Sequence, residues 1–566
     1  MILKKNKLAI AIAALAAAAS GNAAYAGEVA GGNASLQVKL SAIGRYDSGF
    51  RNAGGAEIVQ YDAVSQRLFA INAATASVDV LDITDPTKPT KVGTLHEVQA
   101  SDANSVAVFQ GLVAVVFGAP VKTDPGRVVF YNAQTLERLA SFQVGALPDM
   151  VTFMPDGGAV LVANEAEPNA GYTVDPEGSV SVIDLRAVQN KLDSAELQAM
   201  TVVRTAGFQA FNPKRDQLRA AGIRIYGPPT LPNETGATVA QDLEPEYIAV
   251  AHDGQSAWVT LQEANAVGVL DLSNLDAPYF SEIIPLGLKD HSLPRNKLDA
   301  SDRDNGINIR NWPVKGMYQP DAVASYAIKG QTYYVLANEG DDRNDFIPGE
   351  ETIRVGSIPA DKFAPEVFGD ANAVAALRAN SALGRLTISN YQTSKNAAGQ
   401  YTALNVLGGR SFSIRSADGK LLYDSGSDFE DITAQRYPFV AGAAVNPFNS
   451  SNDNNNFDDR SDNKGPEPEG VALGKIRGRT FAFVGLERVG GIMTYDVTDP
   501  TAARFVDYVN TRNFSLPPAG AATNDVGPEG VAFISADESP TGKPLVVVGH
   551  EISGTTVIFS VEVTGK

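Results

Sequence analysis

The sequence repeats one short phrase near its C-terminal end: residues 465–474 read GPEPEGVALG, and residues 526–534 read VGPEGVAFI. In both stretches a glutamate, Glu469 or Glu529, follows a proline and begins an apolar run with the composition of a buried β-strand. A charge at the start of a buried strand is costly unless it has a partner. The phrase therefore predicts a recurring structural position at which an acidic side chain has a role.

A longer repeated unit surrounds this phrase. The unit begins with an acid or an amide, continues into an apolar strand, turns, and adds a second and commonly a third apolar strand. Copies begin near residues 57, 103, 148, 245, 320, 468 and 528. Short β-branched and aromatic runs separated by turns are typical of a β-meander. Seven such units predict an all-β fold, a seven-bladed β-propeller that occupies residues 27–566 as a single domain.

The strands that flank the repeats predict how the propeller closes. Candidate fourth strands follow four of the copies, at 90–95, 139–145, 280–287 and 505–510. The seventh copy stops after its third strand at 555–563, whereas an unassigned strand at 35–46 precedes the first copy. We expect this N-terminal strand to complete the last blade and close the propeller. The alternative, two unrelated β-domains, explains neither the extra strand nor the missing one.

Three insertions interrupt the repeats, at 186–240, 288–317 and 343–464. The first contains a predicted helix over 193–200, and the second reads as a polar loop. The third contains a predicted helix over 370–383 and a hairpin over 410–424 that we expect to supply the outer strands of the fifth blade. It ends in a polar segment, 450–465, that would be mobile unless other parts of the protein bind it.

The N-terminal residues predict export. Residues 1–26 have the features of a bacterial secretory signal peptide: a lysine-containing start, an apolar stretch over 8–19 and an A-x-A cleavage site that ends at Ala26. No other stretch is apolar and long enough to cross a bilayer. We therefore expect a soluble exported protein, in the periplasm or outside the cell, with no membrane span.

Composition restricts the partners. Asp and Glu number 65 against 46 Lys and Arg, which gives a formal net charge of −19. This charge argues against nucleic acid and anionic membrane surfaces as partners and suits cations. The chain has no cysteine and only four scattered histidines, so a zinc site built from several His or Cys ligands is not expected. We expect a monomer that binds divalent cations.

Aligning the copies gives two sets of candidate ligands. The innermost strand of each propeller blade lines the channel, so residues at its start form a ring at one mouth. The first set occupies this position: Glu57, Asn104, Asp149, Glu246, Asp321, Glu469 and Glu529. The second strand runs back toward the same face. The second set lies at its end in five of the copies: Glu165, Glu263, Glu339, Glu487 and Glu551.

So many carboxylates at one mouth require compensation. Two carboxylates about 4 Å apart repel by roughly 4 kcal/mol at an effective dielectric of about 20. Raised pKa values, pairing with basic side chains, or bound hard cations would relieve this repulsion. The candidate basic partners are Arg343, Arg460, Lys464 and Arg488. Carboxylate, amide and carbonyl oxygens are the ligands of Ca²⁺, so the two sets predict a site for Ca²⁺ or another divalent cation. The alternative for any single acid is to cap backbone N–H groups without an ion.

Four stretches carry a resemblance to a known family. They read DLEPEYIAV (242–250), ANEGDDR (337–343), SDNKGPEPEGVA (461–472) and GPEGVAF (527–533). Together they resemble the choice-of-anchor I family of exported bacterial β-propellers, over nearly the whole mature chain. The resemblance implies a propeller fold and, from some relatives, an atypical alkaline phosphatase or phytase-like esterase activity. It also implies a link to calcium biomineralisation through a cell-surface glycoprotein. It transfers no catalytic residues.

Two functions compete at the level of sequence. In the first, cations at the acidic face polarise a phosphate ester, and Arg343, Arg488 and His550 hold the phosphate charge as catalytic residues. The alternative for these three residues is a set of salt bridges to the ring glutamates. Neither a G-x-S-x-G elbow nor a P-loop is present in the sequence. In the second function, the protein is a non-enzymatic scaffold that binds calcium, a surface polysaccharide or another protein.

Overall fold

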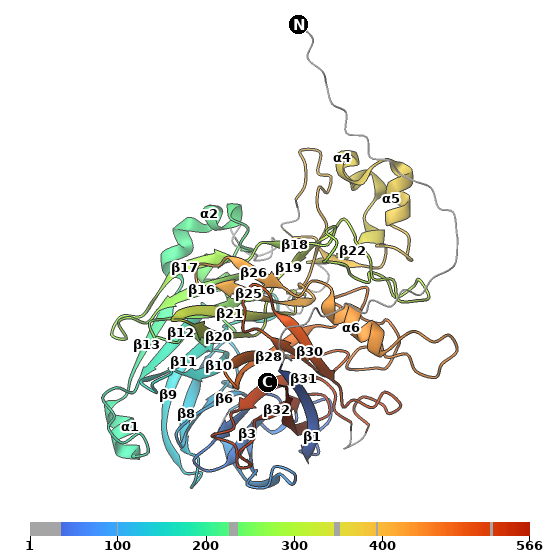
Figure 1. Ribbon diagram of the computed structural model, residues 1–566. Coiled ribbons are helices and arrows are strands. Elements are labelled where there is room, and N and C mark those ends of the chain that lie inside the picture. Colours follow the sequence, from blue (N-terminus) through green and yellow to red (C-terminus); the bar gives the residue numbers. More distant parts are fainter. Residues whose placement is uncertain are drawn as a thin grey trace.

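The computed structural model describes residues 36–98, 100–225, 236–344, 351–391, 394–520 and 524–565. The predicted signal peptide lies outside these residues. The fold is all-β, as predicted, with many four-stranded antiparallel sheets and a few short helices (Figure 1). Among the described residues, no helix has the length and apolar character that a membrane crossing requires.

We number the four-stranded sheets in chain order. The first contains β2 (Val59–Asp62), β3 (Arg67–Asn72), β4 (Ser77–Asp82) and β5 (Thr90–His96). The second contains β6 (Ala103–Phe109), β7 (Leu112–Phe117), β8 (Pro125–Asn132) and β9 (Arg138–Ala146). The third contains β10 (Pro148–Phe153), β11 (Ala159–Asn164), β12 (Ser179–Asp184) and β13 (Val202–Gly207). The fourth contains β14 (Ile248–Val250), β15 (Ser256–Leu261), β16 (Ala266–Asp271) and β17 (Tyr279–Pro285).

The remaining sheets follow the same pattern with two departures. The fifth contains β20 (Val323–Ile328), β21 (Gln331–Asn338), β25 (Ser411–Ser416) and β26 (Leu421–Asp424), so the hairpin predicted over 410–424 supplies its outer strands. The sixth contains β27 (Pro468–Ile476), β28 (Arg479–Leu486), β29 (Ile492–Asp496) and β30 (Arg504–Val509). The seventh contains β31 (Pro528–Ile534), β32 (Leu545–His550), β33 (Thr555–Thr564) and β1 (Gln37–Asp47).

The N-terminal strand pairs with the last strand of the chain, as the sequence predicts. β1 runs antiparallel to β33 from the Gln37–Thr564 pair to the Asp47–Thr555 pair, with one register shift near Gly44. A side chain at Gly44 would collide with the carbonyl of Pro86, which is why the strand has glycine there. The fourth strand of the seventh sheet therefore comes from the opposite end of the chain.

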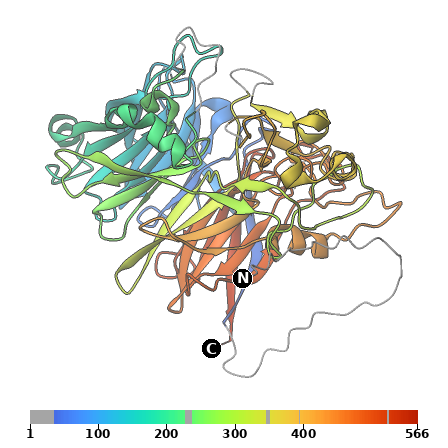
Figure 2. The ribbon, with the colours of Figure 1, turned by 90° about the horizontal axis from the view of Figure 1, so that it is seen from above.

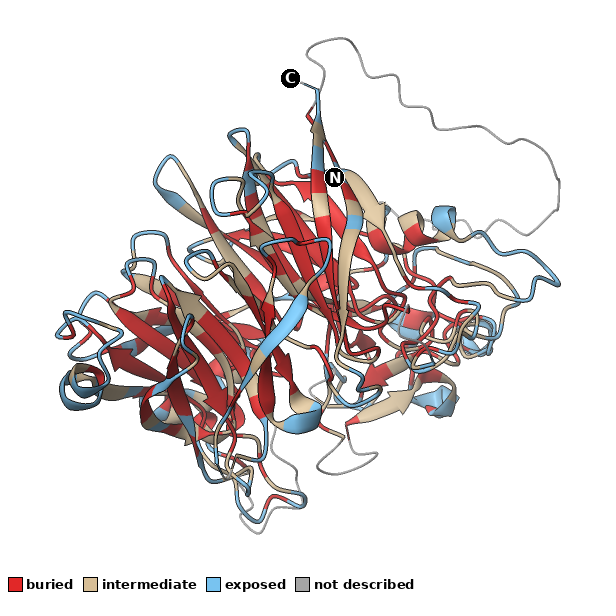
Figure 3. Ribbon diagram, turned by 90° about the horizontal axis from the view of Figure 1, so that it is seen from below, coloured by how far each residue is buried: buried red, intermediate tan, exposed pale blue. Residues whose placement is uncertain are grey.

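Consecutive sheets pack face to face through apolar side chains. One hydrophobic cluster joins each sheet to the next, for example the stacked rings of Trp258 in the fourth sheet and Tyr334 in the fifth, with centroids 4.2 Å apart. A further cluster joins the seventh sheet to the first and contains Val547 and Leu68. Burial follows this arrangement, since strand interiors are buried and the turns are exposed (Figure 3).

The first strands of the seven sheets surround one common space. Each contacts the next in the order β2, β6, β10, β14, β20, β27 and β31, and β31 also contacts β2. Residues from all seven line a cavity of about 620 Å³, which we call the axial cavity; Phe109, Met150, Tyr247 and Phe533 are among them. The starts of these strands, where the candidate acids lie, are thereby brought to one end of the same space.

The insertions contain more regular structure than predicted. The helix predicted over 193–200 is α1 (Ser194–Met200), which begins where the Asp193 carboxylate accepts a hydrogen bond from the Glu196 N–H. The helix predicted over 370–383 is shorter, α5 (Ala371–Leu377). The other helices in the described part of the chain are α2 (Arg215–Ala220), α3 (Val239–Asp242), α4 (Pro365–Phe368) and α6 (Asp428–Arg436).

The second and third insertions combine into an additional five-stranded sheet. It contains β18 (Leu288–Asp290), β19 (Lys315–Met317), β24 (Asn405–Val406), β23 (Thr387–Ser389) and β22 (Thr352–Arg354). The prediction of a polar loop over 288–317 is therefore wrong. Leu298, Trp312 and Val314 from that stretch pack with apolar residues of the third insertion in a core of their own. This lobe, with α4 and α5, lies beside the sheets of the C-terminal half (Figure 2).

The glycine of the repeated phrase gives a test of the packing between the seventh and first sheets. An added Cβ at Gly530 would lie 2.6 Å from the carbonyl oxygen of Glu57, and backbone cannot yield as a flexible side chain can. We expect Gly530→Ala to lower the free energy of unfolding by about 1–3 kcal/mol. Gly306→Ala is the matched control, because only the Asn308 amide lies near, at 3.9 Å. Equal urea-unfolding curves for both variants would contradict the packing.

Candidate functional site

A repeated turn positions the candidate acids. In four sheets the residue two positions before the acid has a positive φ angle: Leu147 (42°), Gln319 (41°), Glu467 (50°) and Gly527 (73°). A proline follows in each case, and Pro148, Pro468 and Pro528 occupy the first position of their strands, where no backbone N–H is needed. The left-handed residue costs roughly 1 kcal/mol where it is not glycine. Because the turn recurs despite this cost, it has a positional role at the start of the first strand.

A β-bulge then directs each acid away from the strand ladder. In the third sheet Pro148 pairs with Asn164, but the next pair is Val151 with Val162. Asp149 and Met150 are thus opposite a single residue. The sixth and seventh sheets show the same shift around Glu469 and Glu529. A bulge of this kind re-aims a side chain, and here the side chain is the acid of the repeated phrase.

The acids of the first set lie close together although they come from different sheets. Glu246 is within electrostatic range of Asp149 and Asp321, and Glu529 is within range of Glu57 and Asp321. Glu469 is within range of Glu529 and Asp321. Asn104, the amide at this position, instead donates a hydrogen bond to the carbonyl of Pro148 at 2.7 Å. The acidic first-strand residues therefore surround the axis at one end of the axial cavity.

The second set lies at the same end. Glu263 is among the main charged neighbours of Glu246, as Glu487 is of Glu469 and Glu551 is of Glu529. Glu339 is the first charged neighbour of Asp321, and Glu165 is a neighbour of Glu246. The structure thus brings together every acid of both predicted sets. We call them the axial carboxylate cluster: Glu57, Asp149, Glu165, Glu246, Glu263, Asp321, Glu339, Glu469, Glu487, Glu529 and Glu551.

Five further acids lie near the axial carboxylate cluster and were not predicted from the sequence. They interact electrostatically with members of the cluster, and they are Asp102, Glu167, Glu244, Asp341 and Glu467. The last four are two positions from a predicted acid, in the phrases EAE, EPE, EGD and EPE. In a strand or a turn with a left-handed residue, a spacing of two can return side chains to one side. This spacing is the signal that could have found them.

Basic side chains neutralise one part of the cluster. Lys464 Nζ lies 2.9 Å from Glu339 Oε1 and 3.0 Å from Glu467 Oε2. Arg488 Nε lies 3.0 Å from Glu467 and 3.0 Å from Glu487, and Arg460 pairs with Glu467 on its other oxygen. One carboxylate oxygen each of Glu339, Glu467 and Glu487 lies within 4.8 Å of the others, but Lys464 and Arg488 pair with these carboxylates. This part of the cluster is therefore held by protein cations.

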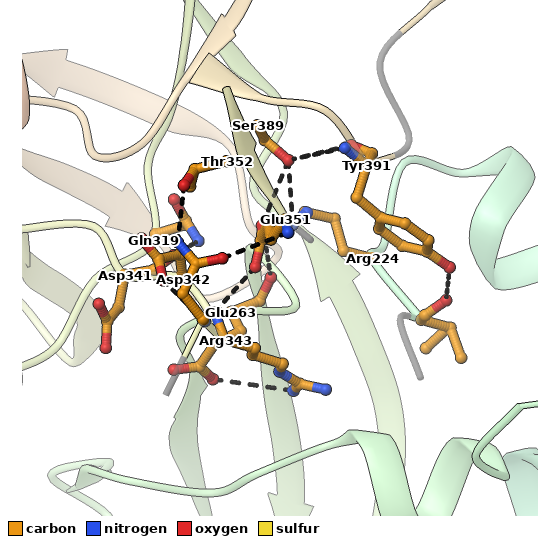
Figure 4. Close-up of polar contacts among 12 residues, drawn as sticks. Arg224, Glu263, Gln319, Asp341, Asp342, Arg343, Glu351, Thr352, Ser389 and Tyr391 are labelled. Carbon is orange, nitrogen blue, oxygen red and sulfur yellow. Dashed lines mark hydrogen bonds and ion pairs between the residues drawn. The ribbon is translucent and has the colours of Figure 1, made fainter. Parts of the chain in front are cut away.

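All four predicted basic partners form ion pairs with acids. Arg343 is the one that lies away from Glu467. Arg343 is buried and pairs with Asp242 at 2.9 Å and Glu244 at 2.8 Å, and more distantly with Glu263 at 3.9 Å. Figure 4 shows Arg343 beside Glu263 and Glu351, and the Glu351 carboxylate also accepts the backbone N–H of Arg343. The guanidinium is consequently surrounded by acids.

The rest of the cluster has no such compensation. Within the described part of the chain, no ion pair includes these eight acids: Glu57, Asp149, Glu165, Glu246, Asp321, Glu469, Glu529 and Glu551. Glu246 Oε2 and Glu469 Oε2 are buried and have no hydrogen-bond partner there. A buried carboxylate oxygen without a partner is unfavourable. These acids are therefore the part of the cluster that still requires a counter-charge.

Burial and mutual repulsion raise the pKa values of these acids. Burial, with the charges of Glu551 and Asp149, raises the pKa of Glu57 to about 8. Burial and the charge of Glu167 raise the pKa of Asp149 to about 7. Glu467 differs, since Lys464, Arg460 and Arg488 lower its pKa well below the usual range although burial opposes them. Three cations around one carboxylate thus reverse the shift at Glu467, whereas a single arginine does not reverse it at Glu487, whose pKa burial still raises.

The polar segment 450–465 is held against the cluster. Asn452 Nδ2 donates to Glu487 Oε1 at 2.7 Å and to Glu551 Oε1 at 3.2 Å, while Arg488 Nη1 donates to Asn452 Oδ1 at 2.8 Å. Arg512 Nη2 donates to the carbonyl of Ser451 at 2.7 Å. Other parts of the protein therefore bind this segment, which is the condition under which it was not expected to be mobile. The segment lies against Glu487 and Glu551 and itself supplies Lys464 and Arg460.

The three candidate catalytic residues have different placements. Arg343 and Arg488 lie at the cluster, but both are engaged in ion pairs with acids. His550 is buried in β32, its Nδ1 is 3.3 Å from the carbonyl oxygen of Thr555, and its charged neighbours are Asp525 and Arg45. The structure does not bring His550 to the two arginines. A catalytic role for the three stays a prediction.

Comparison with known proteins places this arrangement in a family. Residues 57–500 match the choice-of-anchor I domain. This chain belongs to the choice-of-anchor I family. Gigasin-3a of Magallana gigas is 32% identical over 195 residues, which cover 33% of this chain and 68% of that protein. The mesenchyme-specific cell surface glycoprotein of Strongylocentrotus purpuratus is 28% identical over 325 residues, 52% of this chain but only 40% of that protein.

Several solved structures share the general arrangement of strands at low sequence identity. Hydrazine synthase of Kuenenia stuttgartiensis has 13% identity and a TM-score of 0.42, with 91% of this chain and 96% of that chain covered. The β-propeller domain of Myceliophthora thermophila Cps50 (Swd1) has 8% identity and a TM-score of 0.42, with coverages of 93% and 100%. Streptogramin B lyase has 9% identity and a TM-score of 0.41, with coverages of 93% and 98%. These likenesses assign no function to this choice-of-anchor I protein.

Proposed function

We propose that this protein is an exported, seven-bladed β-propeller whose axial carboxylate cluster binds divalent cations, Ca²⁺ first among them. One observation carries the proposal: eight acids from six sheets converge on the axis with no basic partner among the described residues. The propeller arrangement is supported by the pairing of β1 with β33 and by the apolar cluster that joins the seventh sheet to the first. Export is supported by the likeness to a cell surface glycoprotein.

The donor set suits a hard cation. Ca²⁺ takes six to eight oxygen ligands from carboxylates, carbonyls and water, and the uncompensated part of the cluster offers carboxylates. Glu246 Oε2 and Glu469 Oε2, which lack hydrogen-bond partners, are the first candidates for ligand atoms. No cysteine exists in the chain, and no described histidine is among the charged neighbours of Glu246 or Glu469, so a soft or imidazole-preferring metal fits less well.

The axial cavity provides a route to the site. Met150 and Tyr247 line this cavity, and they directly follow Asp149 and Glu246 in the chain. The charges nearest to the Tyr247 hydroxyl include those of Asp321, Asp149 and Glu529. Because segment 450–465 contacts Glu487 and Glu551, we expect cations to reach the other acids through the axial cavity.

Phosphoester hydrolysis at the same place is the second candidate. The observation that favours it is the position of Lys464 and Arg488 beside the acids, where cationic groups and a bound cation could together hold a phosphate ester. A bound divalent cation would polarise a phosphoryl oxygen there. Both side chains are already saturated by Glu339, Glu467 and Glu487, so a phosphate would have to displace a carboxylate. The scaffold function, in which a bound cation stabilises a surface for other molecules, requires no such displacement and is our conclusion.

Stability should depend on pH and Ca²⁺ together. A carboxylate whose pKa is raised in the folded state binds more protons when folded than when unfolded. This holds between the unfolded pKa of about 4.3 and the folded pKa, so stability falls as pH rises through that window. With folded values of about 8 for Glu57 and about 7 for Asp149, we expect the Tm in EDTA to fall between pH 5 and pH 8. Millimolar Ca²⁺ should raise the Tm at pH 8 and change it little at pH 5, where protons neutralise the acids. A Ca²⁺ effect that is equal at both pH values would contradict this.

Single charge removals should have opposite effects with and without the cation. Glu246→Gln and Glu469→Gln each remove one repelling charge, so we expect a higher Tm than wild type in EDTA at pH 8. The same variants lose a ligand, so the rise in Tm on adding Ca²⁺ should be smaller and the affinity weaker by about tenfold or more. Glu282→Gln, on the exposed face of β17, is the control and should match wild type in both conditions. Variants that merely lower the Tm in both conditions would refute the cation site.

Hydrolysis of p-nitrophenyl phosphate separates the two candidate functions. With Ca²⁺, with Mg²⁺ and with EDTA, we expect no turnover above the blank from protein whose Tm rises with Ca²⁺. Glu246→Gln and the control Glu282→Gln should give the same background. Turnover that requires a cation and is lost in Glu246→Gln but not in Glu282→Gln would establish the phosphoesterase and overturn the scaffold function.

A further inference from the structure

A second cavity lies where the insertions meet the fourth sheet. It has a volume of about 420 Å³, and we call it the junction cavity. Its walls include Arg219 and Arg224 of the first insertion, Leu288 of β18, Met317 of β19, Tyr391, and Asn405 of β24. None of these residues belongs to the axial carboxylate cluster. The cavity therefore exists because the insertions fold into an additional sheet beside the propeller-like sheets.

One arginine of the junction cavity is held by neutral groups. Arg219 donates to the carbonyl of Ile225 through Nε at 3.1 Å, and Nη2 donates to the Tyr391 hydroxyl at 3.0 Å. Over the described ranges of the chain, no carboxylate forms an ion pair with Arg219. In a chain of net charge −19, a half-buried guanidinium held in place by neutral groups is a site for an anionic ligand.

Two further polar atoms of the cavity wall lack partners. Arg224 pairs with Glu351 and donates to the carbonyl of Glu263 at 2.7 Å, but its Nε–H has no hydrogen-bond acceptor among the described residues. Asn405 Oδ1 likewise has no donor there. The two residues are only 4% and 7% exposed, so each atom would be left unsatisfied by protein alone. Figure 4 shows Arg224 between Glu351 and Tyr391.

These atoms define what a ligand must carry. An acceptor is needed for Arg224 Nε–H, a hydroxyl donor for Asn405 Oδ1, and an anion for Arg219. Leu288 and Met317 supply apolar wall, against which the C–H face of a ring packs. A single unpaired guanidinium balances a single negative charge. The nearby Glu351 and Glu263 would repel a doubly charged phosphate ester more strongly than a carboxylate.

We propose that the junction cavity binds a sugar carboxylate, such as a uronate residue of an acidic polysaccharide. The carboxylate pairs with Arg219, a ring hydroxyl donates to Asn405 Oδ1, and a second ligand oxygen accepts from Arg224 Nε–H. Leu288 and Met317 contact the ring. This site shares no side chain with the axial carboxylate cluster, although Arg224 also donates to the backbone carbonyl of Glu263.

Calorimetric titration of the full-length protein tests the assignment. The probes are glucuronate, neutral glucose and inorganic phosphate, all in EDTA so that no cation bridges ligand and protein. We expect glucuronate to bind at least about tenfold more tightly than glucose or phosphate. Arg219→Gln should weaken glucuronate binding by about tenfold or more, Arg219→Lys by less, and Asn405→Ala should weaken it as well.

Arg378→Gln is the matched control, since Arg378 is also half-buried and donates to a backbone carbonyl, that of Gly356 at 2.9 Å, but lies away from the cavity. It should bind glucuronate as wild type does. Circular dichroism establishes that each variant is folded, and Arg219→Lys serves if Arg219→Gln is not. The proposal is overturned if folded wild type does not bind glucuronate, if Arg219→Gln and Arg378→Gln bind it equally, or if phosphate binds more tightly than glucuronate.

Discussion

Repulsion between carboxylates that meet on one axis is the constraint from which the rest of the site follows. The third, sixth and seventh sheets deliver an acid through the same device, a left-handed residue, a proline and a bulge, as at Glu467, Pro468 and Glu469. Because the first strands of all seven sheets surround one space, acids far apart in sequence become neighbours. The repulsion between carboxylates of different repeats arises only when the repeats pack around this space.

Protein cations neutralise only part of these acids: Arg343 pairs with Glu244 and Glu263, and a second group of cations surrounds Glu467. Lys464, Arg460 and Arg488 gather around Glu467, and Asn452 joins Glu487 to Glu551. Arg460 and Lys464 come from the polar segment at the end of the third insertion, so an insertion outside the repeat pattern neutralises acids that the repeats supply. The acids around Glu246 and Glu529 have no ion pair among the described residues, and Met150 and Tyr247, which follow Asp149 and Glu246, line the axial cavity. Apolar contact between consecutive sheets, with β1 paired to β33, must hold these acids together against repulsion, since the chain has no disulfide.

The repeat pattern made much of this foreseeable from the sequence. Strand composition predicted the four-stranded units, the extra strand over 35–46 found its partner in β33, and the acids after proline met at one place. The pairing of Lys464 and Arg488 with ring acids was also expected. These features recur in several copies of the repeated unit or lie next to it in the sequence. One sequence therefore contains several independent indications of each.

Features that occur once were not foreseeable. β13 lies in an insertion and has no counterpart phrase, and β18 and β19 are three residues long, too short for an alternating pattern to register. The parallel contact between β19 and β24 joins segments about ninety residues apart without any local signal. Glu467 forms ion pairs with Arg460, Lys464 and Arg488, but nothing in the phrase EPE distinguishes it from Glu469. The junction cavity is lined by Leu288 of β18, Met317 of β19 and Asn405 of β24, and so only the structure reveals it.

Crystals grown with Ca²⁺ test the central claim most directly, through anomalous difference density at the axis. The account predicts a peak coordinated by Glu246, Glu469 or their neighbours among the eight uncompensated acids, with oxygen ligands at about 2.3–2.6 Å. It equally predicts that the space between Glu339, Glu467 and Glu487 stays occupied by Lys464 and Arg488. A map without density on the axis, in which these acids instead cap backbone N–H groups, would contradict it.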